Sequence, residues 1–241
     1  MNRPAAGNLL LDVQRLSKRF GGVVASAGVD LQVLQGEVHA LIGPNGAGKT
    51  TLVAQLAGQL RPDGGRIVFD GDDITHLAPH HRARRGLARS FQITRLFRSF
   101  DVRDNIALAV QAAGAPASSA RVDEVLDEIG LADKADARVD ALSHGEQRAL
   151  EVGLAIAGQP RLVLLDEPMA GMGHDESQRM EALIARMRRH TTVLLIEHDV
   201  DAVFRLADRV SVLVSGQIIA SGAPAAVRAD TGVIEAYLGE E

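Results

Sequence analysis

Cysteine is absent from this chain of 241 residues, so disulfide bonds and metal sites built on thiolates are excluded. Long apolar runs are absent too, because no stretch approaches the roughly 20 residues that a membrane-spanning helix needs. The N-terminal stretch Met1–Asn8 lacks the extended apolar segment of a signal peptide. The missing cysteines fit a reducing cytosol, and we expect any association with a membrane to be peripheral and to depend on a partner protein.

A net basic charge is also missing. The formal charge is −5, so no global positive field draws the chain to nucleic acid, and we expect no nucleic-acid partner. The sequence shows no internal repeat, no low-complexity tract and no long heptad pattern. With 46% hydrophobic residues, the chain can bury a substantial core in one or two domains.

The stretch Gly43–Thr51 fits the pattern G-x-x-x-x-G-K-[ST] of a phosphate-binding loop. Its glycines permit backbone conformations that a Cβ would block, so the N–H groups can turn inward and form an anion-binding nest. Lys49 can reach the β- and γ-phosphates of a nucleotide, and Thr50 offers a hydroxyl to Mg²⁺. The apolar run Val38–Ile42 precedes the loop, and a helix over Lys49–Leu60 is expected after it. This strand–loop–helix context predicts that nucleotide phosphates bind here.

Two carboxylates follow a second apolar run. Leu162–Leu165 reads as a strand buried on both faces, and it ends in Asp166 and Glu167. Adjacent carboxylates at the end of a buried strand are costly unless they are used, and open α/β sheets bind ligands at that end. We expect Asp166 to hold Mg²⁺, directly or through water, and Glu167 to position or deprotonate the attacking water. A turn with a helix cap is the structural alternative.

Two further side chains each allow a structural and a functional interpretation. Phe20 lies in a predicted turn between the strands Leu9–Leu16 and Val29–Val33. It is either a half-buried turn residue or a platform that stacks on a purine base. His198 follows the apolar strand Val193–Ile196. It is either a core or capping histidine or a functional group at the sheet edge where the acidic pair lies.

A capping box and a glycine mark the start of another predicted helix, just after Leu142. Ser143 and Glu146 have the spacing of a capping box, in which each side chain bonds the backbone N–H of the other residue. The box leaves Gly145 unexplained, because a glycine in the first turn costs helix stability. A close approach of the backbone to a ligand would explain this glycine.

Two more segments are less specific. His80–Arg89 holds six basic or potentially basic side chains and is expected to be a solvated face, with a nucleic-acid patch as the alternative. Leu96–Phe100 is an apolar cluster that is either ordinary core or a docking surface for another protein. From about Val102 to Gln159 the pattern is mostly helical, and Val122, Val125, Leu126 and Ile129 recur at helical spacing.

Taken in order, these motifs resemble those of the ATP-binding-cassette ATPases, from about Leu9 to Leu238. The resemblance adds a Q-loop glutamine at Gln92 and a signature segment at Leu142–Glu146, which reads LSHGE where the family usually has LSGGQ. It favours the base-stacking role for Phe20. Two departures stand out: the signature differs at its third and fifth residues, His144 and Glu146, and Gly173 replaces the usual aspartate after the catalytic glutamate.

The resemblance implies a set of site residues. Catalysis would involve Lys49, Gln92, Glu167 and His198, and Mg²⁺ would be held by Thr50, Gln92 and Asp166. ATP would contact residues of two subunits. One subunit would supply Phe20, Gly43, Pro44, Asn45, Gly46, Ala47, Gly48, Lys49, Thr50 and Thr51, and the other would supply Ser143 and Gly145. The fold implied is α/β, a RecA-like P-loop core with an N-terminal antiparallel β subdomain (residues 9–92 and 159–241) and an inserted α-helical subdomain (residues 93–158).

Several short stretches, among them Arg89–Gln92, Pro168–Met172 and the tail Val233–Gly239, resemble ATPases of branched-chain amino-acid importers. Urea and short-amide importers and the lipopolysaccharide-export ATPase are similar. The implied partners are transmembrane permease subunits, a second ATP-binding subunit that is identical or a paralogue, and indirectly a solute-binding protein. The implied location is the cytoplasmic face of the inner membrane.

Three other function classes are compared with transport. A soluble ATP-driven mechanical protein would commonly carry two cassettes or a long coiled coil, and this chain has one phosphate-binding loop. A nucleotide sensor without turnover would not need Glu167. A GTPase is disfavoured because no Asn-Lys-x-Asp follows a strand.

Overall fold

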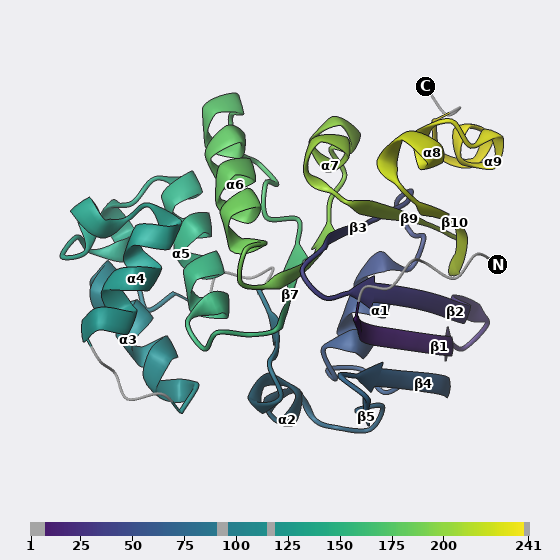
Figure 1. Ribbon diagram of the computed structural model, residues 1–241, viewed down its shortest axis with the longest axis horizontal. Coiled ribbons are helices and arrows are strands. Elements are labelled where there is room, and N and C mark those ends of the chain that lie inside the picture. The colour runs from purple at the N-terminus through teal and green to yellow at the C-terminus, as the bar shows by residue number, and fades with distance from the viewer. Residues whose placement is uncertain (1–7, 91–95, 115–118, 239–241) are drawn as a thin grey trace. The chain divides into compact units, whose positions relative to one another are not determined.

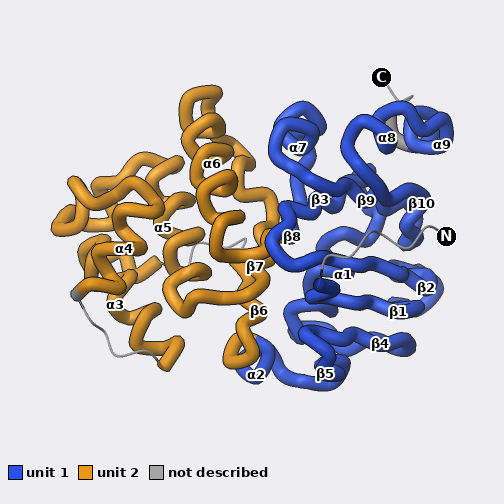
Figure 2. Tube along the Cα trace, in the orientation of Figure 1, with its two compact units in different colours: residues 1–82, 194–241 blue, residues 83–193 orange. Residues whose placement is uncertain are grey.

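The computed structural model describes residues 8–90, 96–114 and 119–238, and its chain divides into two units. Unit 1 comprises residues 1–82 and 194–241, and unit 2 comprises residues 83–193 (Figure 2). The chain thus leaves unit 1 once and returns to it once. The subdomain limits expected from the sequence lie elsewhere and stay a prediction.

Unit 1 contains a four-stranded antiparallel sheet in the order β2-β1-β4-β5 (Figure 1). β1 (Leu9–Phe20) and β2 (Val23–Leu34) pair along their whole length, down to Phe20 opposite Val23. Both strands are longer than the sequence indicated, because pairing continues through exposed residues that carry no apolar pattern. The expected turn is confirmed but is shorter, and only Gly21 and Gly22 form it. β4 (Gly64–Phe69) and β5 (Asp72–Asp73) complete the sheet.

A second sheet in unit 1 has the buried strand β3 (Val38–Ile42) paired in parallel with β9 (Arg209–Val214). β10 (Gln217–Gly222) runs antiparallel to β9, and the two strands form a hairpin. β8 (Thr192–Ile196) is the neighbour of β3 on the other side. The other elements of unit 1 are α1 (Lys49–Leu56), α2 (Pro79–Arg84), α7 (Val200–Leu206), α8 (Pro224–Arg228), α9 (Thr231–Val233) and a π turn over Ile234–Leu238.

A buried chain of polar side chains crosses this second sheet. The fully buried ring of His39 bonds Glu37 Oε1 through Nδ1 at 2.9 Å and Ser211 Oγ through Nε2 at 2.8 Å. Ser211 Oγ in turn lies 2.8 Å from Ser221 Oγ. Burial lowers the pKa of His39 and outweighs the opposing effect of Glu37. Burial alone would raise the pKa of Glu37, but the hydrogen bond from His39 and its charge hold this pKa below its ordinary value.

Helix α1 is shorter than the sequence indicated. It ends at Leu56 and not at Leu60, because Gly58 adopts a left-handed φ of 76° and turns the chain away. The carbonyl groups at this helix end would be unsatisfied without a donor from elsewhere.

Arg82 supplies that donor, and it corrects the expectation that the basic run is wholly solvated. Its side chain is 1% exposed and donates to four backbone carbonyl oxygens. The acceptors are Gln55 O at 2.8 Å, Leu56 O at 2.7 Å, Thr75 O at 2.9 Å and Leu77 O at 3.0 Å. Burial lowers the pKa of Arg82 to about 10, partly offset by the charge of Asp73. The guanidinium therefore stays protonated near neutral pH and binds the C-terminal end of α1, where the helix dipole favours a cation.

In its described residues, unit 2 contains two short parallel strands and four helices. The elements are β6 (Leu87–Arg89), α3 (Val102–Ala112), α4 (Ser119–Ile129), α5 (His144–Ile156), β7 (Leu162–Asp166) and α6 (His174–Met187), with 3₁₀ turns at Ala132–Lys134 and Val139–Ala141. Helices α3, α4 and α5 pack together (Figure 1). The predicted apolar face of α4, formed by Val122, Val125, Leu126 and Ile129, is buried as expected. Among the residues described, no helix is long and apolar enough to cross a membrane.

Candidate functional site

The loop between β3 and α1 holds its lysine close to the backbone. Lys49 is 7% exposed, and its Nζ donates to Gly43 O at 2.6 Å and Pro44 O at 3.1 Å. The ammonium group is thus folded over the loop from which it comes. A buried cation held by neutral carbonyls is a favourable partner for an incoming anion.

The N-terminus of α1 opens onto the same loop. Gly48 is its N-cap, with a φ of 104°, and no side chain caps this helix end in the described structure. A Cβ built on Gly48 would lie 2.2 Å from Ala25 O, so only glycine fits here. The first-turn amides and the dipole of α1 together favour an anion, and Thr50 lies in this first turn.

Phe20 and His198 are both exposed in unit 1. The Phe20 ring is 50% exposed at the end of β1, with Lys18 Nζ 5.6 Å from its centroid. His198 follows β8, and the N-cap of α7 is Asp199. The interpretation of His198 as a core histidine is therefore wrong, and Asp199, not His198, is the N-cap of α7. The exposed aromatic face of Phe20 is compatible with base stacking.

In unit 2, Asp166 ends β7 as a buried carboxylate, 3% exposed. Its Oδ2 accepts a hydrogen bond from Arg89 Nη2 at 2.8 Å. Its Oδ1 is buried and has no hydrogen-bond partner among the described residues. An oxygen of this kind is a suitable ligand for a hard cation such as Mg²⁺. Sequence reasoning missed Arg89 as a partner of Asp166, although Arg89 ends the strand that pairs with β7.

Glu167 directly follows β7 and has a left-handed φ of 51°. Such a conformation costs a non-glycine residue about 1–3 kcal/mol and occurs preferentially at functional sites. The strain supports a function for Glu167 beyond that of an ordinary turn residue.

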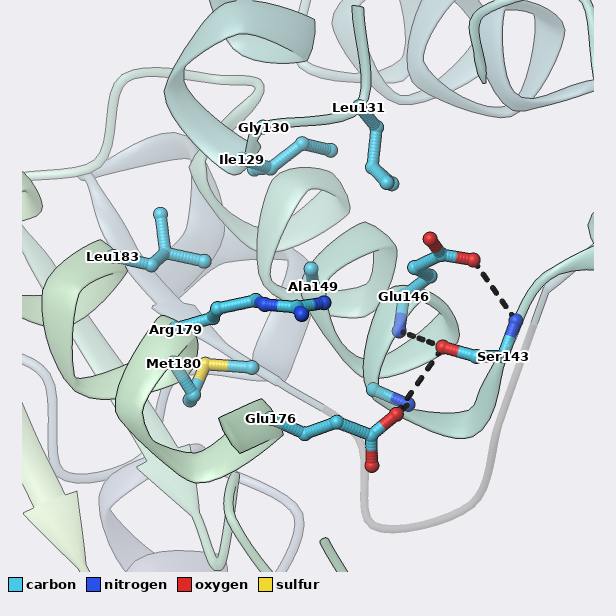
Figure 3. A pocket seen from close by; sticks show the side chains of 11 residues that line it. Ile129, Gly130, Leu131, Ser143, Glu146, Ala149, Glu176, Arg179, Met180 and Leu183 are labelled. Carbon is cyan, nitrogen blue, oxygen red and sulfur yellow. Dashed lines mark hydrogen bonds between the residues drawn. The ribbon is translucent and has the colours of Figure 1, made fainter. Parts of the chain in front are cut away.

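The predicted capping box at the start of α5 is present. Ser143 Oγ accepts from Glu146 N at 3.3 Å, and Glu146 Oε2 accepts from Ser143 N at 2.9 Å. The close approach expected at Gly145 is also present, but the approaching group is the Glu176 carboxylate of α6. Glu176 Oε1 accepts from Gly145 N at 3.1 Å and from Ser143 Oγ at 3.2 Å (Figure 3).

The structure therefore assembles the predicted residues in two separate sets. Unit 1 holds Gly43–Thr51 on one loop and helix end, and unit 2 holds Ser143 and Gly145 at another helix end. Gln92 lies outside the described residues. The described part of the chain contains no cluster of three or more histidine or acidic side chains that would bind a metal by itself. What both sets offer is backbone and hydroxyl donors for an anion at a helix N-terminus.

A family model for ABC transporters matches residues 27–170, and a model for the branched-chain amino acid ATP-binding cassette transporter matches residues 217–241. The chain belongs to the ATP-binding-cassette transporter family. It is a nucleotide-binding ATPase subunit with the α/β P-loop fold of that family, as the sequence predicted.

Two relatives and one solved structure are similar over nearly the whole chain. The chain is 39% identical to the high-affinity branched-chain amino acid transport ATP-binding protein BraF of Pseudomonas aeruginosa, with 100% of both chains covered. It is 38% identical to the high-affinity branched-chain amino acid transport ATP-binding protein LivG of Escherichia coli. This match covers 96% of this chain and 98% of LivG. Among solved structures, it matches the ADP conformation of MJ1267, an ATP-binding cassette of an ABC transporter. The TM-score is 0.87 and the identity 29%, with 96% of this chain and 99% of MJ1267 covered.

Proposed function

We propose that this chain hydrolyses ATP to drive the import of branched-chain amino acids. The observation that carries the substrate class is the match of residues 217–241 to the branched-chain cassette model. This C-terminal segment contains neither the phosphate-binding loop nor the acidic pair. Its match therefore does not depend on the ATP-hydrolysing residues that cassettes for different substrates share. The relatives BraF and LivG, which are branched-chain amino acid transport ATP-binding proteins, support the same substrate class.

ATP binding is the task of unit 1. The triphosphate binds at the N-terminus of α1, where Lys49 exchanges the carbonyl oxygens of its own loop for phosphate oxygens. Phe20 stacks on the adenine ring, which its exposure permits.

Hydrolysis depends on Glu167, with His198 and Gln92 as further catalytic groups. Glu167 positions or deprotonates the water that attacks the γ-phosphate. Its left-handed φ fixes the direction of the Cα–Cβ bond. This limits how far the Glu167 carboxylate must move to reach the attacking water. His198 is exposed and can reach a bound nucleotide without leaving a core.

Magnesium fits the residues present. Thr50, Asp166 and Gln92 would hold it, and the unpartnered Oδ1 of Asp166 is the observation that supports this. When bound, the ion supplies positive charge that offsets the negative charge of the β- and γ-phosphates. Arg89 keeps the Asp166 carboxylate oriented from its other oxygen.

A second cassette completes the site. Ser143 and Gly145 of one subunit donate to the γ-phosphate bound by the other subunit, because the negative charge of the whole triphosphate exceeds what one lysine and one magnesium ion neutralise. ATP then stabilises the closed dimer, and hydrolysis removes this stabilisation.

The permease partner docks on the apolar cluster Leu96–Phe100. Phe97 and Phe100 are 56% and 41% exposed, and their rings stack with centroids 5.5 Å apart. The buried Asn105 fixes this segment, since its side chain bonds both the N–H and the carbonyl of Phe97. Docking on a permease would hold the subunit peripherally at the cytoplasmic face of the membrane.

The test is uptake by the complete importer. The chain, its permeases and its solute-binding protein are reconstituted in vesicles loaded with MgATP, and uptake of radiolabelled leucine, isoleucine and valine is compared with uptake of urea. We expect uptake of the branched-chain amino acids alone. Glu167→Gln should keep ATP binding and lose uptake and phosphate release. Selective uptake of urea or of a short amide would refute the substrate class, and normal turnover in Glu167→Gln would refute the role of that residue.

A further inference from the structure

The Glu176 carboxylate lies at the N-termini of two helices at once. It belongs to the first turn of α6, whose N-cap is Gly173, and its Oε1 accepts from the first turn of α5 (Figure 3). Both helix ends carry partial positive charge. The carboxylate thus lies at a position that favours an anion.

Two donors at this position are fully used by Glu176. A serine hydroxyl and a backbone amide each carry one hydrogen. In this structure the hydrogens of Ser143 Oγ and Gly145 N both point to Glu176 Oε1. Neither donor can serve a phosphate oxygen while this contact lasts. A Cβ built on Gly145 would lie 2.7 Å from Cδ of Glu176, so the carboxylate rests directly against the backbone.

We propose that Glu176 is an internal competitor that closes the signature of the isolated chain until the γ-phosphate of a neighbouring subunit displaces it. This inference rests on the proposed function, because it takes Ser143 and Gly145 as donors to ATP bound by another subunit. The phosphate and the carboxylate are both anions and need the same two hydrogens. Closure of the dimer therefore requires Glu176 to leave.

Arg179 offers the displaced carboxylate a new partner. It lies three residues beyond Glu176 on α6, a spacing that brings side chains together on one helix face. Both residues line the pocket between α4, α5 and α6, and Figure 3 shows the Arg179 side chain extending across it. Arg179 makes no hydrogen bond or salt bridge with the other residues that the structure describes, although the pKa of Glu146 is lowered mainly by the hydrogen bond from Lys134 and to a smaller extent by the charge of Arg179. Once displaced from the signature, Glu176 would lie beside Arg179.

The experiment measures MgATP-dependent dimerisation of the full chain in the Glu167→Gln background, where hydrolysis does not reverse association. Sedimentation velocity over a range of protein concentrations gives the dimer Kd. Each closed dimer contains two signatures, and both must be open. If the signature is open in about one chain in three, Glu176→Gln and Glu176→Ala should therefore tighten the dimer about tenfold. The matched control is Asp175→Asn, which removes one charge from the same exposed helical turn and should leave the Kd within about twofold.

Arg179→Gln should change the dimer Kd in the opposite direction from the Glu176 variants. It should weaken the dimer several-fold when Glu176 is present and have no further effect in the Glu176→Gln variant, since the two residues act on one equilibrium. A tighter dimer in both Glu176 variants, with the control unchanged, supports the competitor.

Two outcomes overturn the proposal in distinguishable ways. An unchanged or weaker dimer in the Glu176 variants, while the parent still dimerises, means that Glu176 only caps α5, and the shared site stands. If the parent and all variants remain monomeric with MgATP, two copies of this chain do not share a site, and the competitor fails as an element of that dimer.

Discussion

Arg82→Met should destabilise the chain more than any surface substitution, because Arg82 satisfies three buried carbonyl groups and one partly buried one. Its donors lie 2.7–3.0 Å from the backbone oxygens of Gln55, Leu56, Thr75 and Leu77. Methionine fills a similar volume but donates nothing. Each buried carbonyl left without a donor costs about 1–3 kcal/mol, whereas removing the buried cation recovers several kcal/mol of desolvation. We therefore expect a net loss of about 3–5 kcal/mol in the free energy of unfolding, because the summed cost of the unsatisfied carbonyls exceeds the recovered desolvation.

Equilibrium urea unfolding followed by far-ultraviolet circular dichroism measures this loss. The control is Arg84→Met on the same helix, which removes an exposed arginine and should change stability by no more than about 0.5 kcal/mol. Arg82→Lys should recover only part of the loss, because an ammonium group lacks the fork of donors that reaches separate carbonyls. A loss below about 1 kcal/mol in Arg82→Met would show that water satisfies the four carbonyls, and the assignment of Arg82 as a helix-capping residue would be refuted.

Three further predictions concern stability and function. Because His39 has a folded pKa below its ordinary value of 6.5, its neutral form contributes stability that is present above pH 6.5 and lost below it. Urea unfolding should therefore show a drop of up to about 1.4 kcal/mol between pH 7.5 and pH 5.5, and a flatter profile in His39→Gln would confirm the source. Lys49→Ala should abolish productive MgATP binding in calorimetry; normal turnover would exclude the lysine from the site. Phe97→Glu should abolish uptake while the isolated subunit keeps its ATPase rate, and surviving uptake would disprove docking at this cluster.

The phosphate-binding loop and the capping box were predictable because their parts are neighbours in the chain. The residues of the loop and the first turn of α1 need only a local pattern, and Ser143 and Glu146 bond across three positions. The buried faces of β3 and α4 were predictable for the same reason, since each follows from a short apolar period.

Contacts between distant residues were not predictable. Arg82 is 27 positions from the carbonyl of Gln55, and Arg89 is 77 positions from Asp166. Composition marked Arg82 as one of six basic side chains and gave no reason to bury it. Gly145 carried a correct signal of close approach, but the approaching carboxylate comes from 31 residues further along the chain. No local pattern shows which carboxylate that is.

The resting geometry of Lys49 bears on how nucleotide enters and leaves. Because two carbonyl oxygens already hold its ammonium group, the side chain does not have to be recruited from solvent when ATP arrives. Product departure likewise leaves the lysine with partners to which it can return. Nucleotide binding and release then change mainly which oxygen atoms accept the hydrogens of Lys49, either Gly43 O and Pro44 O or those of the phosphates.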